Sequence, residues 1–212
     1  MKYYTVENSK KSIFKTFAIY YICMAVFVGI KIFASSVTLP EEKWVDVTYS
    51  MVVQLVVVFL LPLLLYCVLI KVSPKKVFKT CNFNKISPVV ILISIGLGFI
   101  CFFVNIVVSS LSSGLIGFSG YRSVGVALEY DYNIINFLLD IFTVAVLPAL
   151  CEEFLHRGLL LQGTKHMGFK KAILISSLLF GLLHFSIQKF FYAFVVGMIL
   201  GLVAVVSKNI WP

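Results

Sequence analysis

Two adjacent glutamates, Glu152 and Glu153, lie inside an apolar segment long enough to cross a membrane, and Arg157 follows four residues after the second. A lone histidine, His184, lies in another apolar segment further along the chain. Ionisable side chains are costly in hydrocarbon, and they are found there mainly where they pair or do chemistry. A carboxylate and an imidazole together favour hydrolysis by an activated water, so these residues are the first candidates for a functional site.

The spacing of these residues on a helix gives the two carboxylates different roles. Residues four apart share a face, so Glu153 can pair with Arg157, with the acid amino-terminal to the base. Adjacent residues point about 100° apart at 3.6 residues per turn. Glu152 is therefore free to face an internal cavity. His156 follows Glu152 by four residues, and we expect it to pair with Glu152 or to lie near the membrane interface.

The depths of the two catalytic candidates are consistent with a shared site. A carboxylate in a dry cavity is a useful general base, and His184 can hold the water or donate to a developing oxyanion. At the helical rise, Glu152 lies about 15 Å from Gln162, and His184 lies about 20 Å from Lys171. The two groups then have similar depth if Gln162 and Lys171 mark one surface. Pro148 precedes Glu152 by four residues and favours a kink beside a polar cavity.

A purely structural interpretation is the alternative. Both glutamates, Arg157 and His156 would form a buried ionic network that only fixes helix packing, and His184 would be a core histidine. Two glutamates against one arginine leave a surplus negative charge, which a purely structural network would avoid.

The composition predicts the class of protein that holds these residues. Hydrophobic residues make up 60% of the 212-residue chain and charged residues 13%, which is more apolar than a soluble domain of this size requires. Continuous apolar blocks favour membrane-spanning helices, of about 20 residues each, over a barrel. The sequence predicts one all-α domain, a polytopic membrane helix bundle over residues 1–212. Its approximately six transmembrane helices are expected over residues 16–34, 50–70, 88–110, 134–161, 171–187 and 190–207.

The basic residues predict the orientation of this bundle. They concentrate before the first block and in alternate loops, while the opposite loops hold fewer bases and several acids. The positive-inside rule then places the amino terminus in the cytoplasm. The net charge of +9 therefore indicates topology and lipid headgroup contact, and we expect no nucleic-acid partner. The bases of the predicted cytoplasmic side are Lys2, Lys10, Lys11, Lys15, Lys71, Lys75, Lys76, Lys79, Lys85, Lys165, Lys170 and Lys171.

Two motifs together resemble a known family. Glu152-Glu153-x-x-x-Arg157, followed by Phe180-x-x-x-His184, is similar to the first two motifs of the CAAX prenyl protease and bacteriocin-processing (CPBP) family. These proteins are intramembrane endopeptidases and include the lysostaphin resistance protein A-like proteins. The similarity covers a protease core from about residue 145 to the end of the chain, and the earlier helices match only in hydrophobicity.

The resemblance implies roles for the motif residues. Glu152 would activate water and His184 would help to bind it. Glu153, Arg157 and Phe180 would support the site. Family members have been described both as metalloproteases and as glutamate-dependent enzymes. The first description implies Zn²⁺ with Glu152 and His184 as candidate ligands, and the second implies no cofactor. Scattered histidines and one glutamate pair fix no coordination geometry, so both descriptions stay open.

The resemblance also implies partners and a location. A protease of this family would lie in the lipid bilayer and act on a membrane-anchored, prenylated or leader peptide, and the loop pattern favours a bacterial plasma membrane. The family continues with a third motif, His-x-x-x-Asn or His-x-x-x-Asp, on a later helix that the chain lacks. We therefore expect either a longer natural protein or an inactive relative. The alternatives are a non-catalytic bacteriocin-immunity or binding protein on the same scaffold and, less favoured, a small transporter.

Overall fold

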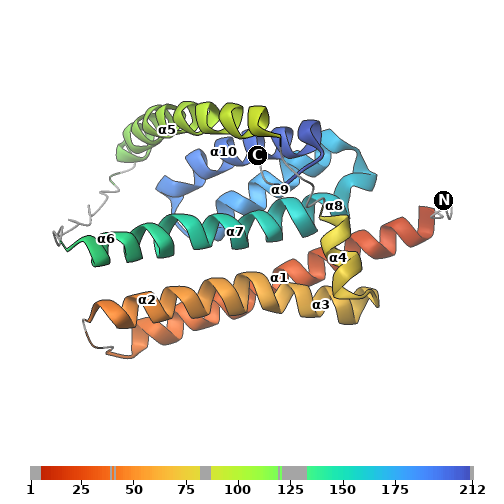
Figure 1. Ribbon diagram of the computed structural model, residues 1–212, viewed down its shortest axis with the longest axis horizontal. Helices are drawn as coiled ribbons and strands as arrows, with labels where there is room; N and C mark the ends of the chain where they lie inside the picture. The colour runs from red at the N-terminus through yellow and green to blue at the C-terminus, as the bar shows by residue number, and fades with distance from the viewer. Residues whose placement is uncertain are drawn as a thin grey trace. The chain divides into compact units, whose positions relative to one another are not determined.

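The computed structural model describes residues 6–38, 40, 42–81, 87–118, 120 and 133–210, with side chains from residue 12 onward. Within these residues the regular structure is helical and contains no strand, as predicted for an all-α chain (Figure 1). Lys2, Lys85 and the side chains of Lys10 and Lys11, which support the predicted orientation, lie outside the described part. Contacts divide the chain into two compact units. Unit 1 comprises Met1–Cys81 and Glu129–Thr164, and unit 2 comprises Asn82–Leu128 and Lys165–Pro212.

Unit 1 contains three long helical segments, and α-helical and π-helical turns alternate in the second and third of them. α1 packs against α3 and η1, η1 packs against α7, and α4 packs against α3 and η3. The first segment (α1) and the second segment (α2 to α3) therefore pack against the third segment, which carries the glutamate pair. The elements are α1 (Val6–Ser36), α2 (Lys43–Val52), η1 (Val53–Leu60), α3 (Leu61–Ile70), α4 (Pro74–Thr80), α6 (Ile134–Asp140), η2 (Ile141–Val146), α7 (Leu147–Glu153), η3 (Phe154–Leu160) and α8 (Leu161–Thr164).

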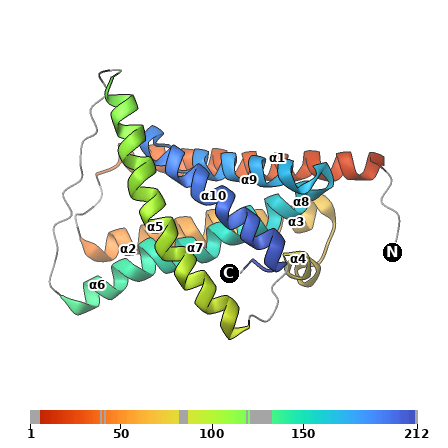
Figure 2. The same ribbon diagram turned by 90° about the horizontal axis from the view of Figure 1, so that it is seen from above.

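Unit 2 contains α5 (Pro88–Gly117), η4 (Lys165–Met167), α9 (Phe169–Leu183) and α10 (Ile187–Ser207). α10 packs along α9 and also contacts α5, which crosses it (Figure 2). Serines begin two of these helices, because a Ser side chain satisfies an otherwise unpaired backbone N–H at a helix start. Ser87 accepts from the backbone N–H of Val90, and Ser186 accepts from that of Lys189.

The two π-helical runs η1 and η2 have a common local cause. A proline inside a helix has no N–H to donate, and its ring clashes with the carbonyl four residues earlier. Pro62 and Pro148 each follow such a run, and the carbonyls they would meet belong to residues within η1 and η2. A π-turn widens the helix and relieves the clash. The predicted irregularity at Pro148 is thus a π-helical run, and the helix continues through it.

Five helical segments among the described residues are long and apolar enough to cross a membrane, and they confirm a polytopic helical membrane protein. They span Ser12–Ser36, Lys43–Ile70, Pro88–Gly117, Ile134–Met167 and Ile187–Ser207. The remaining predicted block, residues 171–187, corresponds to α9, whose 15 residues extend about 22 Å at the helical rise. α9 ends early because Phe185 adopts a left-handed backbone with φ 47° and Ser186 starts the next helix.

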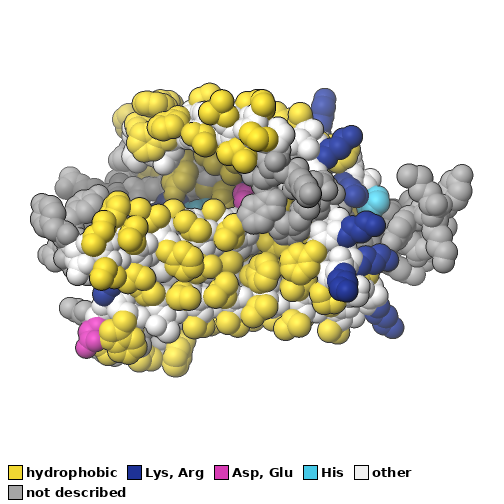
Figure 3. Space-filling view, viewed as in Figure 1, with side chains coloured by type: hydrophobic (Ala, Val, Ile, Leu, Met, Phe, Trp, Pro, Cys, Tyr) yellow, Lys and Arg dark blue, Asp and Glu magenta, His cyan; other side chains and the backbone are white. Residues whose placement is uncertain are grey.

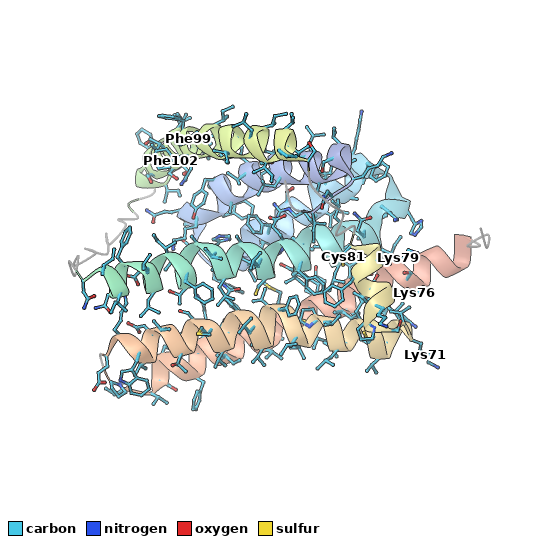
Figure 4. The ribbon with its side chains drawn as sticks, viewed as in Figure 1. Lys71, Lys76, Lys79, Cys81, Phe99 and Phe102 are labelled. Atoms are coloured by element: carbon cyan, nitrogen blue, oxygen red, sulfur yellow. The ribbon has the colours of Figure 1, made fainter. Side chains whose placement is uncertain are left out.

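The surface of unit 1 matches the predicted distribution of charge. Exposed hydrophobic side chains are spread over the visible face (Figure 3), as lipid contact requires. The lysines of and beside α4 are exposed, and Lys71, Lys76 and Lys79 lie together at the α4 end of unit 1 (Figure 4). Val77 faces inward on the same short helix and is buried. α4 is therefore an amphipathic helix with one basic face.

Candidate active site

The ion pair predicted from helical spacing is present in unit 1. Arg157 Nη1 of the guanidinium lies 2.8 Å from Glu153 Oε1, one helical turn away. The Arg157 side chain is fully buried, whereas the Glu153 side chain is 23% exposed. A fully buried guanidinium is tolerated only with a close counter-charge. The Glu153 carboxylate supplies that counter-charge to Arg157.

Glu152 points in a different direction from Glu153, toward the second span. Its carboxylate Oε1 accepts from Gln54 Nε2, on η1, at 3.4 Å. Glu152 is only partly exposed. Adjacent carboxylates thus have separate partners, as expected from their angular separation on a helix. The surplus negative charge that the sequence predicts belongs to Glu152.

His156 is buried in unit 1 and contacts Glu152, the first of the two predicted alternatives. Its side chain is fully buried, so it is not a surface group. Its Nδ1 lies 2.9 Å from the backbone carbonyl oxygen of Glu152, so the ring contacts the main chain of Glu152. The ring also meets that of Tyr20 edge-on, with centroids 5.8 Å apart. A sequence cannot separate main-chain from side-chain partners at the same spacing, because both lie one turn away.

The π-helical run η3, which follows the glutamate pair, is buried along its whole length. The Phe154 ring packs against Phe59 and Phe78, with centroids 4.6 Å and 5.7 Å away. Gly158 lets α4 approach closely, since a Cβ there would lie 3.0 Å from Cys81 Sγ. These contacts fix the rotation of the helix that carries Glu152.

Cys81 has no sign of catalytic reactivity. Burial raises the pKa of its thiol to about 12, so the nucleophilic thiolate is not formed near neutral pH. Its small side chain instead fills the space beside Gly158. The thiol is a packing group.

The second motif lies in unit 2, at the carboxyl end of α9. His184 Nδ1 lies 3.0 Å from the backbone carbonyl oxygen of Phe180, so in the neutral ring Nδ1 is the donor and Nε2 carries the lone pair. The Phe180 ring meets the imidazole edge-on at 5.2 Å, and Tyr192 does so at 6.1 Å. Phe180 is buried against Gly197 of α10. The imidazole orientation is thereby held by its own helix and by two aromatic rings.

The predicted site residues therefore fall into two groups. Glu152, Glu153 and Arg157 gather in unit 1, and Phe180 and His184 gather in unit 2. The geometry within each group agrees with the motif spacing. The pairing of Glu152 with His184 stays a prediction.

The donor set of the described residues does not by itself make up a zinc site. Zinc takes at least three protein ligands, mainly His, Cys and carboxylates. Across the described part of the chain, no group of three or more such side chains is placed to hold a metal.

Gln54 is a further candidate site residue that the motifs do not include. It contacts Glu152 from a span that the family motifs do not cover. A signal for it exists in the sequence, because Gln54 is the only hydrogen-bonding side chain between Ser50 and Tyr66. Polar side chains within a membrane span are often functional, so an isolated glutamine in such a run is a candidate.

The fold and the buried ionisable groups define a polytopic helical membrane protein with a carboxylate site. Residues 134–212 match the family model of the type II CAAX prenyl endopeptidase Rce1-like proteins, which confirms the predicted resemblance over that region. This region contains both motifs and includes α6, α7, α9 and α10. No curated protein and no solved structure gives a significant match.

Proposed function

We propose that the protein is an intramembrane endopeptidase that uses a Glu152-activated water to cleave membrane-associated peptides. One observation carries this proposal: inside the region that matches a protease family, Glu153 neutralises Arg157, and Glu152 is a separate carboxylate beside a polar partner. In a purely structural network, we would expect both glutamates to form ion pairs with cationic side chains. The proposed substrates are prenylated CAAX-type peptides or bacteriocin leader peptides, in a bacterial plasma membrane.

The proposed reaction consumes only water. Glu152 accepts one proton from the water, and the water oxygen bonds to the scissile carbonyl carbon. The carbon–nitrogen bond then breaks, and Glu152 returns the proton to the leaving amine. His184 would help to place the water beside the scissile carbonyl, and its ring orientation is fixed because Nδ1 donates to the Phe180 carbonyl.

The test uses the full chain in proteoliposomes, with an S-farnesylated CAAX-type peptide and an unprenylated leader-type peptide as probes. We expect Glu152→Gln to lower the cleavage rate at least about 100-fold, because the amide cannot take a proton. Asp46→Asn is the matched control, since Asp46 is an exposed acid of α2. Equal rates for wild type and Glu152→Gln would refute the role of Glu152.

Two further arms separate the alternatives. Cleavage that survives 1,10-phenanthroline supports the glutamate base, whereas loss of cleavage that added Zn²⁺ restores supports the metalloprotease description. A wild-type protein that binds a probe peptide and leaves it intact would instead support a non-catalytic binding protein.

A further inference from the structure

Gln54 occupies an unusual place for an amide. It lies in η1, the π-helical run of the second span, with only apolar residues around it from Met51 to Leu65. An amide without hydrogen-bond partners is costly in such surroundings. π-Helical runs inside α-helices are frequently found at functional sites. Both the nitrogen and the oxygen of this amide are therefore expected to have polar partners.

One end of the amide faces the proposed base. Gln54 Nε2 donates to Glu152 Oε1 at 3.4 Å, which joins residues 98 positions apart in the sequence. The orientation follows from chemistry, since a carboxylate only accepts and the NH₂ end must face it. The distance is longer than usual for N–H···O bonds, and catalytic hydrogen bonds are often long before substrate binds.

The other end of the amide, its carbonyl oxygen, is not hydrogen-bonded within the described residues. Gln54 Oε1 is buried there and has no hydrogen-bond partner among them. An amide that served only to join two helices would satisfy its oxygen as well as its nitrogen. The oxygen is an acceptor held beside the carboxylate that the proposed reaction uses, because both atoms belong to one rigid amide plane.

We propose that Gln54 is a further catalytic residue, whose nitrogen holds the Glu152 carboxylate and whose oxygen accepts a hydrogen bond from the attacking water. This inference rests on the proposed function. One O–H of the water donates to Glu152, which takes that proton, and the other O–H donates to Gln54 and keeps its proton. Two fixed hydrogen bonds leave a lone pair of the water oxygen to attack the scissile carbonyl carbon. Gln54 itself gains and loses no proton.

The kinetic test compares Gln54→Met with wild type on the farnesylated probe peptide in proteoliposomes. Methionine keeps the length of the side chain and removes both the donor and the acceptor. We expect kcat to fall about 10- to 100-fold, as for other orienting groups, with KM changed less than about twofold. Asn105→Leu is the matched control because Asn105 is an amide in the α5 span that accepts from Ser109 of its own helix. We expect that control to keep the wild-type kcat.

A spectroscopic test does not need cleavage. The C=O band of protonated Glu152 is assigned by pH-difference infrared spectroscopy as the band that Glu152→Gln removes. We expect Gln54→Met to move this band to higher wavenumber, because the carboxyl group loses a donor, and Asn105→Leu to leave it in place.

The outcomes of the two tests are separable. An unchanged band, or a wild-type kcat in Gln54→Met, would overturn the role of Gln54 and leave the proposed endopeptidase function standing. Absence of cleavage by wild type would overturn the proposed function, and with it the role of Gln54 in orienting water. A band shift in that case would establish only the Gln54–Glu152 contact.

Discussion

Arg157 shows how a single buried charge constrains this site. Its guanidinium is fully buried and pairs with Glu153 at 2.8 Å. The pair was predictable because both members lie one turn apart on a helix. The contact between Gln54 and Glu152 was not predictable, because it joins distant segments through tertiary packing that no local pattern encodes. Local spacing thus identifies the pair that neutralises charge, and only the fold identifies the partner of the proposed base.

Removal of Arg157 tests the energetic value of the pair. We expect Arg157→Ala to destabilise the protein by about 3 kcal/mol or more, because Glu153 would remain as a charge without its counter-ion. The measurement is thermal unfolding in detergent. The double variant Glu153→Gln with Arg157→Met should recover much of the loss, since both charges are removed together. An unfolding temperature of Arg157→Ala equal to that of wild type would argue against the ion pair.

At the scale of elements, small residues allow α9 and α10 to pack closely. Ala193, Gly197, Gly201 and Ala204 are all buried along α10. A Cβ at Gly197 would lie 3.2 Å from the Cα of Ser177 on α9. Small residues four apart are a common device for close helix contact in membranes, where lipid offers no hydrophobic drive. The same contact holds the backbone segment from which Phe180 and His184 project.

A larger side chain at Gly197 should therefore disrupt unit 2. We expect Gly197→Leu to cost about 1–3 kcal/mol of stability through overpacking and to reduce activity by displacing Phe180. Gly96→Leu is the matched control, because a Cβ at Gly96 of α5 meets nothing within 4 Å. Thermal unfolding of both variants in detergent checks this expectation, and equal stability of the two would contradict it.

Helix boundaries were less predictable than helix identity. The five long spans follow directly from continuous apolar blocks. The end of α9 does not follow from the sequence. Apolar residues continue at Phe185 and Ile187, and no proline or glycine interrupts the chain there. The left-handed backbone at Phe185 ends the helix there. Left-handed conformations are rare for aromatic residues, so sequence reasoning favours a longer helix.

At the scale of the whole molecule, the charge pattern predicts which ends of the spans face the cytoplasm. The span Lys43–Ile70 separates the exposed Trp44 from the basic face of α4. Anionic lipid and the insertion machinery favour lysine-rich loops on the cytoplasmic side. The α4 end of unit 1 is therefore expected inside the cell, with the amino terminus.

Cysteine labelling tests this orientation. We expect Lys76→Cys to react with a membrane-impermeant maleimide only in inside-out vesicles, and Trp44→Cys only in right-side-out vesicles. Cys67 and Cys101, which are partly exposed, are replaced by alanine in the background, while the three buried cysteines are kept. Labelling of Lys76→Cys in right-side-out vesicles would reverse the predicted topology.

The length of α9 has a consequence for the membrane around the protein. A 15-residue helix covers about 22 Å, while the hydrocarbon core is about 30 Å thick. Lipid tails offer no partners to the carbonyl groups at a helix terminus, so water or protein must solvate the backbone after His184. Local thinning is one way in which a bilayer accommodates a helix shorter than its hydrocarbon core. A bilayer thinned beside α9 would bring bulk solvent, and with it the hydrolytic reactant, closer to the imidazole.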